Sequence, residues 1–177
     1  DHLNYYDSLE HIQDTVVEAL AANPRLERVL LNADCPGALA LKGRLSVPVT
    51  TFGRETDADI RAVQVEAEAM QARFELVAEG VSLGRLTLEL PGLYNVGNAI
   101  AACAACLTLG AEPDALRAAL PLFRGLENRF TVVHAGGRRI IKDYISHPTG
   151  IRRVLEAAAA DGRRITAVFK PYRFTMI

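Results

Sequence analysis

The feature that most constrains the fold is the segment at residues 90–110, LPGLYNVGNAIAACAACLTLG. A Pro-Gly turn opens it, small and apolar residues follow at helical spacing, and a glycine ends it. We therefore expect one long, largely buried helix. Asn95 and Asn98 are three residues apart and share one face of the first turn. Polar amides at the start of a helix that is otherwise buried predict a ligand-facing edge on a core element.

The composition is that of an ordinary soluble protein. With 177 residues, 50% of them hydrophobic, the chain can build one good core or two small ones. A net charge of −1 argues against a basic nucleic-acid-binding surface. There is no signal peptide and no apolar run long enough to span a membrane, so we expect a cytoplasmic protein without membrane or nucleic-acid partners. Because the chain begins at Asp1 and stops soon after an apparent strand, we expect a piece of a longer protein.

Hydrophobic periodicity divides the first part of the chain into helices and strands. The expected elements are a helix at residues 8–22, short strands at 28–32 and 47–52, and three antiparallel strands between 60 and 90. Asp7 and Glu10 predict a capping box at the start of the first helix. A second helix is expected at residues 112–122.

The polar segment 125–129 is the best candidate for a domain boundary, because a fresh strand pattern begins after it. The expected elements there are a β-hairpin at 130–134 and 139–144, a helix capped by Ser146 with Pro148 in its first turn, and a buried strand at 165–169 of the kind found in parallel sheets. This strand–helix–strand order predicts an α/β domain.

Residues 143–149, DYISHPT, run from a strand end into a helix start. In open α/β sheets ligands bind at this edge, and a helix N-terminus favours negative charge. Asp143 can accept hydrogen bonds from a ribose there, and Tyr144 and His147 can face a substrate. The alternative is that the segment only caps its helix and that His147 is a bystander.

The other candidate side chains are isolated in the sequence. Arg173, after the last strand, and Arg129 can each clamp a carboxylate or simply lie on the surface. His2 can ligate a metal or be a solvated loop side chain. Cys103 and Cys106 lie inside the alanine-rich helix without a second ligand pair, so we interpret them as buried thiols. The chain contains neither a phosphate loop nor a G-x-G-x-x-G motif.

Five motifs in a fixed order make the chain resemble the Mur ligases, which use ATP to join amino acids to UDP-linked peptidoglycan precursors. The motifs are DHLNYY at residues 1–6, P-G-x-x-N-x-x-N-A at 91–99, G-x-x-x-R-F at 125–130, D-Y-x-x-H-P-T at 143–149 and F-x-P-x-R at 169–173. Their order across nearly the whole chain is more specific than any single motif. Within the family, the chain is most similar to members that add L-alanine to UDP-N-acetylmuramate.

The resemblance implies an α/β chain from a three-domain enzyme. Residues 1–124 would be the later part of the central ATPase domain, with an antiparallel strand subdomain and a helix pair. Residues 125–177 would begin a Rossmann-like C-terminal domain that binds the amino acid. The UDP-binding domain and the phosphate loop would lie upstream of Asp1, so we expect residues 1–177 alone to lack ligase activity.

The resemblance also implies ATP and Mg²⁺ as cofactors, with UDP-N-acetylmuramate and an amino acid as substrates. By the resemblance, Asn95 and Asn98 would lie beside adenine and ribose, and Arg129 and Asp143 would contact the nucleotide from across the domain junction. Tyr144 and the catalytic residues His147 and Arg173 would surround the amino acid. His2 would be a ligand of magnesium. The reaction would serve peptidoglycan synthesis, and with it cell-wall biogenesis, cell shape and cell division.

Several positions depart from the family pattern. Tyr94 replaces the usual histidine and Lys142 replaces an acidic residue. The other departures are Ser146, Gly150, Tyr172 and Met176, which cluster around the implied amino-acid site. The alternatives are therefore another Mur-type ligase, a ligase that recycles muropeptides, and a non-catalytic α/β binding module.

Overall fold

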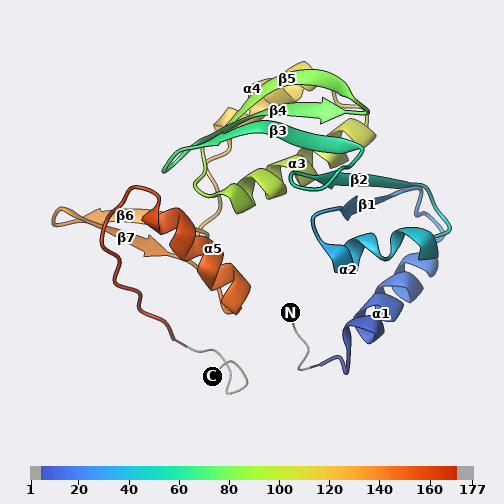
Figure 1. The fold of residues 1–177 in the computed structure, drawn as a ribbon, viewed down its shortest axis with the longest axis horizontal. Helices are drawn as coiled ribbons and strands as arrows, with labels where there is room; N and C mark the ends of the chain where they lie inside the picture. The colour runs from blue at the N-terminus through green and yellow to red at the C-terminus, as the bar shows by residue number, and fades with distance from the viewer. Residues whose placement is uncertain (1–4, 171–177) are drawn as a thin grey trace.

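Five strands form one mixed sheet (Figure 1). The structure, a computed structural model, describes residues 5–170. In sheet order the strands are β1 (Val29–Asn32), β2 (Val49–Gly53), β3 (Ile60–Ala67), β4 (Ala72–Ala78) and β5 (Val81–Leu88). β1, β2 and β3 pair in parallel, whereas β3, β4 and β5 form an antiparallel meander. The strands expected between residues 28 and 90 are confirmed.

The meander buries one face through alternating side chains. Its buried residues are Ile60, Ala62, Ala72, Phe74, Leu76, Leu86 and Leu88. A register shift in β3 falls between Val63 and Glu66, where Gln64 has a φ of 49°. Such a bulge adds one residue to the strand, which explains why the apolar alternation moves from Ala62 to Val65 rather than to residue 64.

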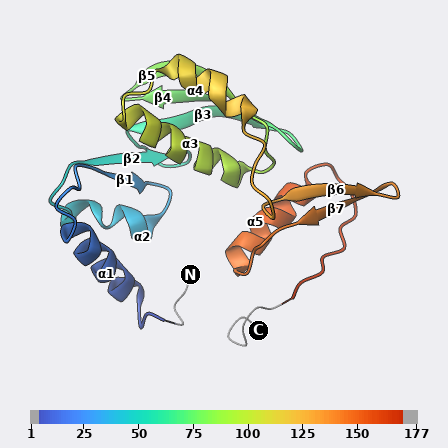
Figure 2. The same ribbon diagram turned by 180° about the vertical axis from the view of Figure 1, so that it is seen from behind.

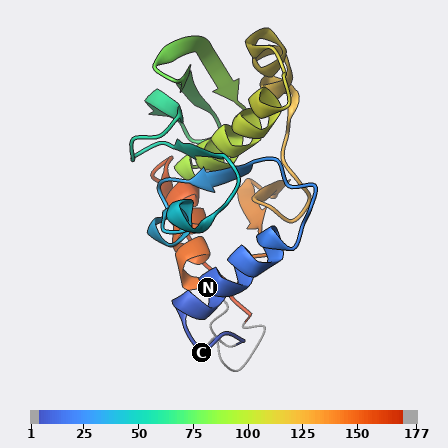
Figure 3. The ribbon, with the colours of Figure 1, turned by 90° about the vertical axis from the view of Figure 1, so that its right-hand side faces the viewer.

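Helix α3 (Leu93–Thr108) covers the buried face of the sheet (Figure 3). Val96, Ile100 and Ala104 are fully buried against the sheet. Gly92 precedes the helix with a φ of 82°, and a Cβ there would lie 2.9 Å from the Cβ of Ala157. Only glycine meets both demands, the left-handed backbone and the close contact. The long helix predicted from residues 90–110 is confirmed, with five of its 16 residues buried.

Two helices pack on the other face of β1. They are α1 (Leu9–Ala21) and α2 (Pro36–Leu39), the latter followed by the 3₁₀ turn η1 (Lys42–Arg44). Val29 and Leu31 of β1 pack with Leu41 in this second cluster, whereas Leu30 points to the α3 side. The expected capping box is wrong: Ser8 is the N-cap of α1, and its hydroxyl accepts from the His11 backbone N–H.

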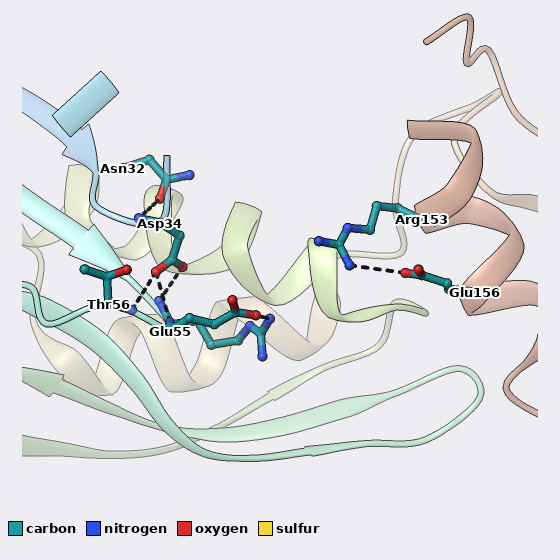
Figure 4. A network of polar contacts seen from close by, with 7 residues as sticks. Asn32, Asp34, Glu55, Thr56, Arg153 and Glu156 are labelled. Atoms are coloured by element: carbon teal, nitrogen blue, oxygen red, sulfur yellow. Dashed lines mark hydrogen bonds and ion pairs between the residues drawn. The ribbon is translucent and has the colours of Figure 1, made fainter. Parts of the chain in front are cut away.

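The loop between β2 and β3 is unusually short for a parallel connection, which normally needs a dozen residues or more. β3 overlaps β2 by only two residue pairs, so the loop must fold back on itself. Two carboxylates hold it. Asp34, after β1, accepts hydrogen bonds from the backbone N–H groups of Arg54, Glu55 and Thr56 (Figure 4). Asp59 accepts from both the backbone and the hydroxyl of Thr51.

The remaining elements follow α3. They are α4 (Pro113–Ala119) with the 3₁₀ turn η2 (Leu120–Leu122), the hairpin β6 (Thr131–Ala135) and β7 (Arg138–Lys142), and α5 (Pro148–Ala159). α4 packs on β5, while the hairpin and α5 lie near the start of α3 (Figure 2). A third cluster, in which Phe130 and Ala157 are buried, joins the hairpin and α5 to Tyr94 of α3. The predicted hairpin and helix are confirmed.

Two expectations for the last segment are wrong. His147, not Ser146, is the N-cap of α5, and its side chain makes no capping hydrogen bond. Residues 165–169 form no strand and are exposed. An apolar run becomes a buried strand only beside a partner strand, and among residues 5–170 none pairs with it.

Cys35, Cys103 and Cys106 are free thiols; Cys103 is buried as expected, whereas Cys106 is only half-buried. No helix within residues 5–170 has both the length and the apolar character needed to cross a membrane.

Candidate functional site

A cavity of about 1100 Å³ lies at the start of α3. Its lining comes from the end of β5 and α3, from α4, η2 and the segment 123–132, and from residues 143–154. Four residues that the sequence marked separately line it together: Asn95, Asn98, Arg129 and Asp143. The fold thus places the asparagine pair and the junction residues around one space.

The asparagine pair forms part of the polar lining. Asn95 is half-buried, and its amide donates to the Pro91 carbonyl, with 2.7 Å between Nδ2 and O. The Asn98 amide donates in turn to the Asn95 side-chain oxygen at 3.2 Å. Asn95 therefore stabilises the first turn of α3, while the exposed Asn98 is the more accessible of the two to a ligand.

Asp143 is held at the same end by the junction segment. Its Oδ2 accepts from the backbone N–H of Phe130 at 2.9 Å, and its Oδ1 lies 4.0 Å from the Arg129 guanidinium. Phe130 has a φ of 50°, an uncommon conformation for a bulky residue, so the bond to Asp143 helps to hold a strained backbone. Arg129 also donates to the Tyr144 carbonyl at 3.0 Å.

The second carboxylate oxygen of Asp143 is the most informative atom of the site. The side chain is only 9% exposed, and Oδ1 is buried without a hydrogen-bond donor among the described residues. A buried acceptor without a donor costs about 1–3 kcal/mol. A ligand hydroxyl that donates to Oδ1 would recover that cost.

Tyr94 connects the two sides of the cavity. It is half-buried, lines the cavity and packs in the cluster of Phe130 and Ala157. Burial and the nearby charge of Asp143 raise the pKa of the Tyr94 phenol. A hydrogen bond with Asn95 lowers that pKa, but the net shift is upward. The phenol is therefore neutral at physiological pH and offers a ring face together with a polar group.

Away from these polar groups the lining is largely apolar. It includes Leu90, Ala99, Ala102, Leu120 and Phe123. Cys103 and Cys106 also contribute to it, and burial raises the pKa of the Cys103 thiol to about 11. An apolar surface with a few convergent polar groups is the usual character of a small-molecule site.

Other predicted residues lie elsewhere. Tyr144 is 71% exposed and does not line the cavity. His147 is half-buried at the start of α5, also outside the lining. His2 and Arg173 lie outside the described residues. Within residues 5–170 no group of three or more His, Cys, Asp or Glu side chains could hold a metal ion.

The structure also adds residues that no motif indicated. Arg124 and Arg153 line the cavity, and so does Glu89. Arg153 is four residues after Thr149, one helical turn beyond the D-Y-x-x-H-P-T segment. Helical spacing within the expected α5 was therefore a signal that could have found it.

Comparison of the whole chain with known proteins points to one family. A sequence family described as the Mur ligase middle domain matches residues 1–106. A UDP-N-acetylmuramate–L-alanine ligase from Dinoroseobacter shibae is 39% identical over 100% of this chain, which spans 39% of that protein.

Solved structures share the fold. MurF from Acinetobacter baumannii has a TM-score of 0.78 at 22% identity, covering 88% of this chain and 34% of that one. The UDP-N-acetylmuramate–alanine ligase MurC from Thermotoga maritima has a TM-score of 0.72 at 28% identity, covering 90% and 36%. The chain therefore spans little more than a third of the length of these relatives.

Proposed function

This chain belongs to the Mur ligase family, and we propose that it carries part of the nucleotide site of an ATP-dependent ligase. In this proposal the protein that contains it joins L-alanine to UDP-N-acetylmuramate during peptidoglycan precursor synthesis in the cytoplasm. The choice of amino acid rests on relatives such as the Dinoroseobacter shibae protein, named for L-alanine.

The buried Oδ1 of Asp143 is the observation that carries the proposal. A ribose hydroxyl placed there donates the hydrogen bond that the protein does not supply. A purine base beside it packs against the apolar lining and Tyr94, with the exposed Asn98 amide at its polar edge. The cavity thus has the chemistry that a nucleoside requires.

The proposed reaction has two steps. The muramoyl carboxylate attacks the γ-phosphorus of ATP, which forms an acyl phosphate and releases ADP. The amine of the amino acid then attacks the carbonyl carbon, forming an amide, and phosphate leaves. Positioning of the nucleotide against the acceptor carboxylate is the main contribution that such a site makes. In this scheme Tyr144, His147 and Arg173 are proposed at the amino-acid end.

Magnesium would neutralise charge on the phosphates. Among residues 5–170 no group of three or more His, Cys, Asp or Glu side chains could hold it, and His2, the proposed ligand, lies outside them.

The test uses the protein that contains residues 1–177, supplied with ATP, Mg²⁺, UDP-N-acetylmuramate and a panel of L-alanine, glycine, L-serine and a muropeptide. Mass spectrometry of the product and ADP release are measured. We expect ADP release to depend on both substrates, and L-alanine to give the highest kcat/KM. A different preferred substrate would reject L-alanine and retain the ligase. Folded protein without product from any substrate would reject the enzyme in favour of a binding module.

A further inference from the structure

Arg153 is a cationic residue of helix α5, and none of the family motifs contains it. Its side chain lines the cavity together with Asn98 and Asp143. Figure 4 shows the Arg153 guanidinium beside Glu156 of the same helix.

Three arginines line the cavity, and their partners differ. Arg124 is paired with Glu89 at 3.5 Å, and Arg129 is engaged by the Tyr144 carbonyl and Asp143. Arg153 contacts Glu156, one turn along its own helix, at 3.2 Å. The Arg153 and Glu156 side chains are 55% and 53% exposed, and such a surface pair is worth little. The Arg153 guanidinium can therefore turn to an anionic ligand at small cost.

The direction of the strands bears on where the phosphates of a bound nucleotide would lie relative to Arg153. β1 and β2 point their carboxyl ends toward the part of the molecule that contains α5, as Figures 1 and 2 agree. Ligands of open α/β sheets bind outside the carboxyl ends of the strands. A nucleotide whose ribose lies at Asp143 and whose phosphates extend toward these strand ends brings those phosphates to the cavity that Arg153 lines.

We infer that Arg153 binds the phosphate chain of the nucleoside di- or triphosphate in this cavity. The inference rests on the proposed function for the identity of the ligand, and it adds a binding residue from α5. A guanidinium can donate two parallel hydrogen bonds to a phosphate, so charge and geometry both contribute to affinity.

The experiment compares the dissociation constants of ADP and adenosine for the protein that contains this chain, by calorimetry and by competition. Arg153→Gln should weaken ADP binding by about tenfold, the effect of losing one charge-assisted contact of about 1.4 kcal/mol. Adenosine binding should change by less than about twofold, because adenosine carries no phosphate. Arg153→Lys should recover part of the ADP affinity.

Arg152→Gln is the matched control. Arg152 is exposed, adjacent on the same helix and outside the cavity lining, so its variant removes the same charge and should bind ADP like the wild type. Equal loss of ADP and adenosine binding in Arg153→Gln, or no loss of either, would overturn the inference. A wild-type protein that binds neither ligand would instead overturn the proposed function.

Discussion

At the scale of single residues, Tyr94 has two roles, one in a hydrophobic cluster and one in the lining of the cavity. Its ring packs with Phe130 and Ala157, and it also lines the cavity. Gly92 makes room for this arrangement, since a Cβ there would lie 2.7 Å from the Tyr94 ring. Tyr94 therefore connects α3 to the hairpin and α5.

Tyr94→Ala should loosen this connection. Full burial of a large aromatic ring is worth about 3–5 kcal/mol on truncation, and Tyr94 is half-buried, so we expect a loss of about 2 kcal/mol. Hydrogen exchange through local opening should then accelerate roughly thirtyfold in β6, β7 and α5, with the β3–β5 meander unchanged. Tyr94→Phe keeps the ring and should behave like the wild type. Unaltered exchange in α5 would contradict the role given to Tyr94.

At the scale of elements, the loop between β2 and β3 depends on two ionised carboxylates. Burial alone would raise the pKa of Asp34, but hydrogen bonds from Arg54, Thr56 and Glu55 outweigh it and leave that pKa below its ordinary value. The backbone and hydroxyl of Thr51 likewise lower the pKa of Asp59. Each group contributes stability above the pKa that it has in the unfolded chain, and this stability is lost as pH falls through the lower folded pKa.

Stability should therefore decline as the pH falls below about 4, the ordinary aspartate value. Urea unfolding at a series of pH values measures this decline. The double variant Asp34→Asn, Asp59→Asn should be less stable than the wild type at pH 7. Its free energy of unfolding should also decrease less as the pH is lowered. Asp57→Asn is the control, because Asp57 lies in the same loop with a side chain that is 92% exposed. An acid profile of the double variant that parallels the wild type would contradict this account.

Periodicity predicted the elements well, because local apolar spacing records which face of a helix or strand is buried. It identified α3, the meander and the β6–β7 hairpin. It failed at residues 165–169, where an apolar run has no partner strand among the described residues. It also missed the carboxylate support from Asp34 and Asp59, because hydrogen bonds between distant segments leave no periodic signal.

At the scale of the whole molecule, the site forms where segments distant in sequence meet. The motifs indicated Asn95, Asn98, Arg129 and Asp143, and the fold brings all four to one cavity. The sequence could not indicate the buried Asp143 oxygen, since its burial depends on how the hairpin and α5 pack against α3. It also marked Tyr144, which the fold leaves exposed.

The central claim is that this cavity receives the nucleoside of ATP. A crystal structure of the protein that contains this chain, bound to ADP, tests it most directly. We predict that a ribose hydroxyl lies within hydrogen-bond distance of Asp143 Oδ1, that the base lies against the apolar lining beside Asn98, and that the phosphates extend past Arg153. ADP bound elsewhere with this cavity empty, or a ribose that makes no contact with Asp143, would contradict the claim.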